Sequence, residues 1–359
     1  MEPEPGAGGL SVLVCGTAFD PRTTTAVELR GVGEITAESL WGLSQLANVR
    51  TLRVSDSTFS DAGWAVLMEA VRGLPVSELG VSGCAMGPRH AADLADYVMS
   101  AGGSLTTLRC GSNPGMVGEL DRYGGLETPD AHIEGFRRLC EALKPSQVTE
   151  VDFSGCGLGP LGADSVADYV RNAIAVMKRV VLSNNFLFGS KDQNPYDTSQ
   201  VHDVDANQTG WAALCQSFKG SSLEELVLVD IGMGVKGVTT LADAIRAMAG
   251  LNKISVRMND IGAEGGAVLA SAACEMSRAR LRACQVLAFS KALHERLGSD
   301  CALDVVADVT LGIATAVRSL HGHEALSRRL AQAGEPWFEV VIDGLDEEGV
   351  PPTRSYDGY

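Results

Sequence analysis

One pattern of apolar residues returns at least seven times between residues 49 and 261, and it limits what this chain can fold into. Each copy reads Leu-x-x-Leu-x-Val/Leu-x-x-Asn/Cys-x-Leu, with other apolar residues in some of the places. The second apolar anchors are Leu52, Leu79, Leu108, Val151, Val180, Leu226 and Ile254. Alternating apolar positions indicate a short strand with one buried face. Because no such unit can bury its apolar face alone, the sequence predicts a stack of units that cover one another.

A helical stretch follows each strand and turn, for example at residues 162–171 and 241–248. Successive second anchors are 27, 29, 43, 29, 46 and 28 residues apart, so the two long intervals contain insertions, which we place at 117–129 and 189–204. The first apolar anchor of each copy lies three residues before the second anchor, and the residue eight places after the first anchor, which we call the closing residue, follows the end of the strand. A buried Asn at that place is expected to hydrogen-bond to the backbone of the turn, and Cys is a small substitute for it. These closing residues are Ser57, Cys84, Asn113, Cys156, Asn185, Ile231 and Asn259.

A second, longer period is superimposed on the first. Residues 130–144 and 205–219 align at an offset of 75, and in both an aromatic residue, Phe136 or Trp211, precedes a Leu-Cys pair. The alternate helices carry Ala-Asp instead, at residues 95–96 and 167–168. Both insertions fall before the aromatic type of helix, so the sequence indicates that the repeats work in pairs.

The repeat length and pattern resemble the ribonuclease-inhibitor type of leucine-rich repeat, which is also found in NOD-like receptors and Ran GTPase-activating proteins. The resemblance covers about residues 24–275. It implies an α/β leucine-rich repeat solenoid, a horseshoe with parallel strands on its concave face and helices on its convex face. We expect a flexible N-terminus at 1–9, and a repeat domain at 10–275 that has a capping strand at Ser11–Cys15 and about eight repeats. Residues 276–345 are expected to form a helical C-terminal cap or a small helical module, followed by a polar tail at 346–359.

Charge and cysteine usage restrict the setting of the protein. The net charge of −16 and the lack of a basic run oppose nucleic-acid binding. No apolar run approaches the roughly 18 residues that span a bilayer, and the acidic start MEPEPGAGG is unlike a signal peptide. The nine cysteines form no C-x-x-C motif, and several lie at core positions, namely Cys84, Cys110, Cys140, Cys156 and Cys215. We interpret them as reduced, which favours a cytoplasmic or nuclear protein.

Several motifs that suggest chemistry have a simpler structural interpretation. The sequence G-x-G-x-x-G at Gly157–Gly162 has the context of a dinucleotide-binding loop, but it returns at Gly232–Gly237 in the same phase, where each repeat needs a turn into its helix. Residues 205–210 match half of a calcium loop without its final carboxylate, so we predict that Asp130 and Asp205 are helix N-caps. His321 and His323 lack further ligands at metal spacing. The sequence therefore predicts no catalytic residue, no cofactor and no metal.

Outward residues of neighbouring parallel strands should form columns, because the strands lie about 4.8 Å apart. One column reads Thr51, Glu78, Thr107, Glu150, Arg179, Glu225 and Lys253, and from Glu150 onward its charges alternate, so unlike neighbours should pair. The next reads Arg53, Gly80, Arg109, Asp152, Val181, Val227 and Ser255, with an apolar step at the two valines. An apolar centre with a polar edge suits protein recognition. The candidate binding residues are therefore Arg53, Arg109, Asp152, Arg179, Val181, Glu225, Val227 and Lys253; the alternative is that these charges only keep the face soluble.

The two insertions should project from one rim of the stack, because each lies between a strand and a helix. Long loops in an otherwise economical repeat often carry recognition. Within them Tyr123, Tyr196 and Asp197 are further candidates for partner binding, since an exposed Tyr offers a large contact area at low entropic cost. The alternative is that both insertions are tolerated decoration.

These features favour a non-catalytic scaffold, adaptor or structural subunit of a larger assembly that binds protein partners, without nucleic-acid binding or membrane insertion. A second candidate is a GTPase-activating protein of the Ran-directed type, although no motif supplies a catalytic residue and the acidic tail of that branch is reduced here to residues 346–348. A sensor like the NOD-like receptors would need its nucleotide-binding module elsewhere. The fold alone does not select among these activities.

Overall fold

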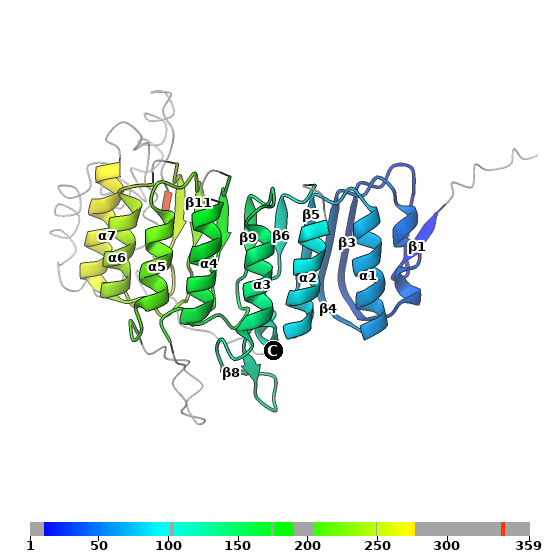
Figure 1. Cartoon of the computed structure of the whole chain (residues 1–359), viewed down its shortest axis with the longest axis horizontal. Coiled ribbons are helices and arrows are strands. Elements are labelled where there is room, and N and C mark those ends of the chain that lie inside the picture. The colour runs from blue at the N-terminus through cyan, green and yellow to red at the C-terminus, as the bar shows by residue number, and fades with distance from the viewer. Residues whose placement is uncertain are drawn as a thin grey trace, which may run out of the picture.

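The computed structural model describes residues 11–100, 104–173, 176–189, 204–248, 250–276 and 339–341. One sheet of nine parallel strands runs through the molecule, and the α-helices cover one of its faces (Figure 1). In sheet order the strands are β3 (Ala26–Ile35), β4 (Thr51–Phe59), β5 (Glu78–Ser82), β6 (Thr107–Arg109), β9 (Glu150–Asp152), β10 (Arg179–Val181), β11 (Glu225–Val227), β12 (Lys253–Ser255) and β13 (Glu339–Val341). This arrangement confirms the predicted α/β repeat solenoid.

A helix follows each strand from β4 to β12. The helices are α1 (Asp61–Gly73), α2 (Pro88–Ser100), α3 (Ile133–Leu143), α4 (Pro160–Asn172), α5 (Thr209–Phe218), α6 (Val235–Ile245) and α7 (Gly262–Met276). The predicted helix at 162–171 lies within α4, whereas the one predicted at 241–248 begins six residues earlier and ends at Ile245. Apolar periodicity locates a helix face, but the turn chemistry sets its ends.

The repeated anchors form the core between the sheet and the helices. All seven second anchors are at most 1% exposed, as are Phe136 and Trp211 on the aromatic type of helix and Tyr97 and Tyr169 on the alternate type. Each strand is only three residues long from β6 onward, so a strand has few apolar contacts of its own. Its stability therefore depends on the repeats on either side.

Buried asparagines tie the repeats together in pairs. The side-chain oxygen of Asn185 accepts hydrogen bonds from the backbone N–H groups of Cys156 (3.1 Å) and Leu158 (3.0 Å) in the preceding repeat. Its amide nitrogen donates to the carbonyl of Phe153 (2.8 Å) there and to two carbonyls of its own turn. Asn113 and Asn259 make the same set of bonds to the repeats of Cys84 and Ile231. The predicted role of the closing Asn is confirmed, and each one serves the turn of its neighbour as well as its own.

The N-terminal end contains one more repeat strand than the sequence pattern showed. β3 pairs in parallel with β4, with Val27 opposite Leu52. Before it, β1 (Val12–Val14) and β2 (Thr17–Phe19) form an antiparallel hairpin, so the predicted strand at Ser11–Cys15 is present but has a partner of its own. Two short 3-10 turns, η1 (Glu38–Leu40) and η2 (Leu43–Gln45), replace the helix between β3 and β4.

The predicted flexible N-terminus at 1–9, the polar tail and most of the predicted helical C-terminal segment lie outside the described residues. The exception is β13, which pairs in parallel with β12. Residues 339–341 lie in the segment that was expected to be a helical cap, and the structure instead adds a strand there to the sheet edge. An added strand satisfies the edge backbone groups of β12, which a helix packed across the end would leave without partners.

Candidate protein-binding surface

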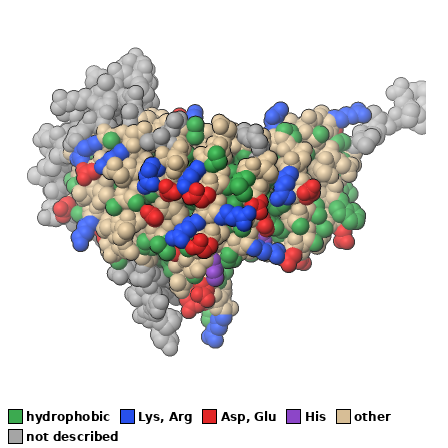
Figure 2. Space-filling view, in the orientation of Figure 1, with side chains coloured by type: hydrophobic (Ala, Val, Ile, Leu, Met, Phe, Trp, Pro, Cys, Tyr) green, Lys and Arg blue, Asp and Glu red, His purple; other side chains and the backbone are tan. Residues whose placement is uncertain are grey.

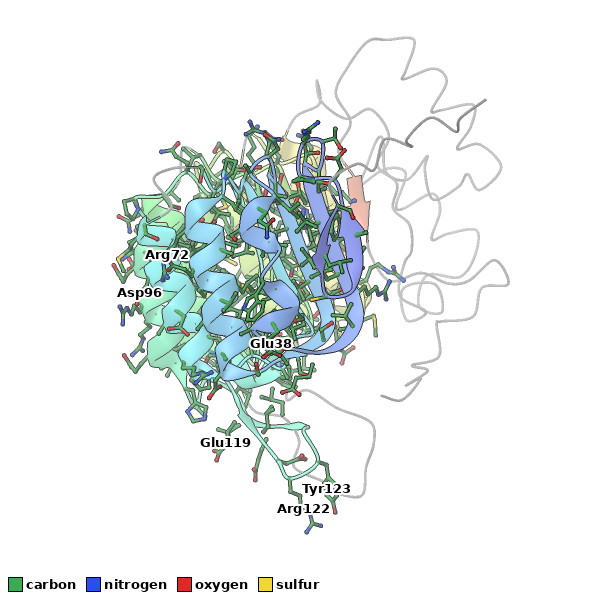
Figure 3. All side chains as sticks on the ribbon, turned by 90° about the vertical axis from the view of Figure 1, so that its right-hand side faces the viewer. Glu38, Arg72, Asp96, Glu119, Arg122 and Tyr123 are labelled. Atoms are coloured by element: carbon green, nitrogen blue, oxygen red, sulfur yellow. The ribbon has the colours of Figure 1, made fainter. Side chains whose placement is uncertain are left out.

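The strand register places the predicted outward residues in two columns on the face of the sheet opposite the helices, which we call the strand face. Figure 3 shows the helices on one side of the sheet and this face on the other. The Cα partners run from Thr51 through Glu78, Thr107, Glu150, Arg179 and Glu225 to Lys253, and from Arg53 through Gly80, Arg109, Asp152, Val181 and Val227 to Ser255. Both columns therefore have the predicted composition. β3 extends the second column with Glu28, opposite Arg53.

Glu78 is the centre of a chain of ion pairs over the N-terminal half of the strand face. Its carboxylate accepts hydrogen bonds from the Nε atoms of Arg53 and Arg109, both at 2.9 Å. Arg53 also donates to Glu28 at 2.7 Å, and Arg109 lies 3.6 Å from Glu150. Burial alone would raise the pKa of Glu78, but the two arginines outweigh burial and hold that pKa below its usual value. In turn, the hydrogen bond to Glu78 raises the pKa of Arg53.

A second cluster of charges covers the C-terminal half. Arg179 donates from Nε to Glu225 at 3.0 Å, and the Lys253 ammonium lies 3.6 Å from the same carboxylate. Within the described part of the chain no ion pair joins Glu150 to Arg179, although the two are Cα partners. The expected pairing of these two residues is therefore wrong, because Glu150 is engaged by Arg109 from the other column and Arg179 turns to Glu225. The Nη1 atom of Arg179 is buried and has no hydrogen-bond partner.

The exposed apolar part of the strand face is smaller than the sequence suggested. Val227 is half-buried, but Val181 is only 6% exposed, so its predicted place on the open surface is wrong. Asp152 is partly engaged as well, since its Oδ1 accepts hydrogen bonds from the backbone N–H and the hydroxyl of Ser154, at 3.0 and 2.6 Å.

The first insertion forms an antiparallel hairpin, β7 (Glu119–Leu120) and β8 (Leu126–Thr128), at the rim of the stack (Figure 1). It follows a short 3-10 turn, η3 (Pro114–Met116), which comes directly after the closing Asn113. Tyr123 lies at the tip and is 79% exposed (Figure 3). In the second insertion Tyr196 and Asp197 lie outside the described residues, so their predicted role remains a prediction.

Comparison with known proteins agrees with the geometry of the repeats. No family model matches the chain. The chain is 28% identical to a ribonuclease inhibitor of Mus musculus over 171 residues, which are 46% of this chain and 33% of that protein. The chain thus spans about a third of the length of this relative. The repeats are leucine-rich repeats of the ribonuclease-inhibitor type.

The leucine-rich repeat protein also overlaps a solved structure of the TLR13–ssRNA13 complex. The TM-score is 0.37 at 16% sequence identity, and the match covers 69% of this chain and 35% of that chain. A TM-score of this size does not bear on the function of the repeat protein.

Both glycine-rich turns of the repeat protein hold a carboxylate from the chain itself. Asp130 accepts hydrogen bonds from the N–H groups of Gly159 (2.8 Å) and Gly162 (3.0 Å) at Oδ1 and of Leu161 (2.7 Å) at Oδ2. Asp205 makes the same three bonds to residues 234, 236 and 237. A Cβ at Gly159 would lie 2.6 Å from the Asp130 carboxylate, so only glycine fits there. The G-x-G-x-x-G sequence thus forms an anion cradle that is filled by an aspartate.

The two aspartates cap helix N-termini as predicted, but each caps the helix of the next repeat and not the helix that follows it in its own repeat. Asp130 caps α4 and Asp205 caps α6, which are helices of the next repeat, whereas α3 and α5 begin after His132 and Gln208. Both aspartates have a positive φ, 60° and 58°, which turns the carboxylate back across the repeat boundary. Burial raises the pKa of Asp130, against the opposing effect of the three backbone N–H groups.

Other candidate chemistry remains structural. The five cysteines predicted in the core are buried and free, and burial raises the pKa of Cys84 to about 12 and that of Cys110 further. Among the described residues no group of three or more His, Cys, Asp or Glu is arranged to hold a metal ion. Nor does any helix in the described ranges have the length and apolar character needed to cross a membrane. His321 and His323 lie outside those ranges.

Two residues near the candidate sites, Glu28 on the strand face and Arg122 in the hairpin, were not predicted from the sequence. Glu28 was missed because a polar residue, Thr24, occupies the place of the first apolar anchor in its repeat, so the pattern is incomplete there. Arg122, whose guanidinium lies 4.5 Å above the Tyr123 ring, was not singled out although it is adjacent to a candidate. An exposed Arg-Tyr pair at the centre of an insertion is a signal that could have located the hairpin tip.

Proposed function

We propose that the protein is a non-catalytic scaffold, an adaptor or a structural subunit of a larger complex, that binds a protein partner on its strand face. The observation that carries this proposal is the pair of ion-paired clusters that extend from β3 to β12. Their side chains are held by one another and still face solvent, for example Glu28 at 62%, Arg53 at 45% and Lys253 at 43% exposed. A partner would therefore meet charges that are already in place.

Preorganised charge favours a specific partner over catalysis. Side chains that are fixed before association lose less entropy on binding, and complementary charge contributes to specificity and to the rate of association. Proton-transfer catalysis needs a group with a pKa near the working pH. The pKa of Glu78 is shifted further from neutral pH, because its arginine partners lower it. The similarity to a ribonuclease inhibitor, a protein named for acting on another protein, agrees with a protein partner.

The helix face is a poorer candidate for a specific surface. Figure 2 shows acidic and basic side chains interspersed over it, without a large area of one sign. Several of these charges join neighbouring helices, such as Arg138 on α3 with Asp96 on α2. A variant on this face therefore provides a matched control for the strand face.

The test is a charge swap that keeps the intramolecular pairs. In Arg179→Glu/Glu225→Arg/Lys253→Glu the pairs of position 225 with positions 179 and 253 are both kept with their signs reversed, so folding should be preserved while the charges that a partner meets are reversed. Recovery of the proteins that co-purify with the native chain should fall at least about tenfold, the effect of losing about 1.4 kcal/mol of binding. The control Arg138→Glu removes a more exposed ion pair on the helix face, with side chains 54% and 42% exposed against 26% and 27% for Arg179 and Glu225, and should change recovery less than twofold. Equal recovery with the swap and the native chain would remove the strand face from consideration.

A further inference from the structure

The rim hairpin (Glu119–Thr128) has a tip that is rigid before any partner arrives. The Oδ1 atom of Asp121 accepts hydrogen bonds from the backbone N–H groups of Tyr123 (2.7 Å) and Gly125 (2.9 Å). The backbone adds two more bonds across the turn, Asp121 to Gly125 (2.8 Å) and Gly124 to Asp121 (3.0 Å). Gly124 supplies the positive φ of 83° that closes the turn. The backbone of the tip is thus held by the side chain of one aspartate.

The hairpin is also fixed at its base. The N–H of Gly118 donates to the carbonyl of Pro114 (3.0 Å), and the N–H of His132 donates to that of Val117 (2.7 Å). Leu126 packs directly on Gly118, where an added Cβ would lie 2.1 Å from Cδ1 of the leucine. The position of the tip relative to the repeats is therefore set by backbone bonds and by close packing.

The chemistry at the tip is that of an interface anchor. Tyr123 is the most exposed large apolar side chain of the described residues at 79%, and Leu120 of the same hairpin is 40% exposed. The Arg122 guanidinium stacks over the Tyr123 ring. Within the described part of the chain Arg122 makes no ion pair, in contrast to Arg53 and Arg109 on the strand face. Tyr and Arg are the residues that most often dominate the energy of protein interfaces.

We propose that this tip is a second, separate anchor for the protein partner, which inserts Tyr123 into an apolar pocket and pairs Arg122 with a carboxylate at the rim of that pocket. This inference rests on the proposed function, since it takes the partner to be a protein. A guanidinium that keeps its five donors available pairs best with a planar anion. The net charge of −16 opposes a polyanion such as a polyphosphate backbone, and a single side-chain carboxylate of the protein partner is the planar anion that we assign to Arg122.

Site-specific photo-crosslinking in the full chain tests where the partner touches. Three variants carry p-benzoylphenylalanine, at Tyr123 on the tip, at Val227 on the strand face and at Trp41, which is 67% exposed at the N-terminal end and serves as the control. Irradiation in a lysate of the cells that express the protein, followed by mass spectrometry, identifies each captured species and the peptide that was reached. We expect positions 123 and 227 to capture the same protein at least about tenfold above position 41, and the peptide reached from 123 to contain Asp or Glu.

Charge exchange then tests the assigned chemistry with the captured protein as the probe. Arg122→Glu should weaken its binding about tenfold or more, and replacing the carboxylate of the captured peptide by Lys should restore binding to Arg122→Glu alone. Capture from 227 but not from 123 overturns the hairpin anchor and leaves the proposed function standing, whereas capture from neither position overturns both. Capture of RNA, or unchanged binding by Arg122→Glu, overturns the pairing with a carboxylate.

Discussion

Two kinds of side chain join neighbouring repeats, and they do so in different environments. Within a pair of repeats the joint is an asparagine, as at Asn113 and Asn185, which are fully buried. Between pairs it is an aspartate, Asp130 or Asp205, which is half-buried at the rim. A neutral amide can donate and accept without placing a charge in the core, where an ionised group would be costly. A carboxylate suits the rim because it faces three N–H groups at the start of a helix, where negative charge is favourable.

The two joints alternate along the stack and explain the longer period of the sequence. Asn113 binds the turn of the preceding repeat, Asp130 binds the start of α4 in the next, and the order repeats 75 residues later with Asp205. Each insertion ends directly before its aspartate, at residues 129 and 204. Each insertion therefore has a structural end, which delivers the aspartate.

The largest effect on the free energy of unfolding is expected for the asparagine that joins the two repeats of a pair. Asn185→Leu keeps the approximate size of the side chain but removes five hydrogen bonds and leaves backbone groups of two turns without partners. At about 1–3 kcal/mol for a buried polar group left unsatisfied, we expect a loss of about 3–5 kcal/mol in the free energy of unfolding. Urea unfolding followed by circular dichroism measures this loss.

The control for this variant is Asn252→Leu, at an exposed position before β12. It should change the free energy of unfolding by no more than about 0.5 kcal/mol. If Asn185→Leu were equally mild, the asparagine joint would not be what holds the pair together.

A smaller effect is expected for the joint between pairs, because water can reach some of the freed N–H groups. Asp130→Ala should cost about 2 kcal/mol, the upper range for losing a helix cap. Gly159→Ala should also destabilise the native chain, since its Cβ would lie 2.6 Å from the Asp130 carboxylate. In the Asp130→Ala background that clash is gone, so the second substitution should cost at least about 1 kcal/mol less.

A double-mutant cycle from urea unfolding gives this coupling directly. The cycle with Asp205→Ala and Gly234→Ala should show a smaller coupling, because a Cβ at Gly234 would lie 2.6 Å from the Asp205 carboxylate but also 2.5 Å from Cγ1 of Val204, which Asp205→Ala leaves in place. Strictly additive costs in both cycles would contradict a cradle built around the aspartate.

The sequence predicted those features that the core imposes. The two strand-face columns follow from the anchors, because burial of one face fixes the register and with it every outward residue. The chain alone could not show that Asp130 reaches α4, since its bonds span 29 to 32 residues and a local N-cap fits the same sequence equally well. Likewise Arg109 contacts Glu78 and Glu150 of the other column, and these contacts depend on the rotamers of long side chains. The apolar periodicity of the sequence does not encode those rotamers.

The smallest effect on the free energy of unfolding is expected for the ion pairs of the strand face, which also connect neighbouring repeats. In the folded protein the pKa of Glu78 lies below its usual value of 4.5, because two arginines favour the carboxylate. The stability that results is present above that value and is lost as the pH falls through the folded pKa. Exposed pairs contribute little, so Glu78→Gln should cost only about 1 kcal/mol at pH 7. Thermal unfolding as a function of pH should show the two curves converging below pH 4.5.

The cause of this pH dependence can be separated from burial by removing the donors. In Arg53→Met/Arg109→Met the hydrogen bonds that lower the pKa of Glu78 are absent, while burial, which raises it, remains. Glu78→Gln in that background should therefore be neutral or stabilising at pH 7, the opposite sign to its effect in the native chain, and any stabilisation should disappear as acidification protonates Glu78. A gap between Glu78→Gln and the native chain that does not shrink as the pH falls below 4.5 would show that the arginine pairs of Glu78 add nothing to the asparagine and aspartate joints.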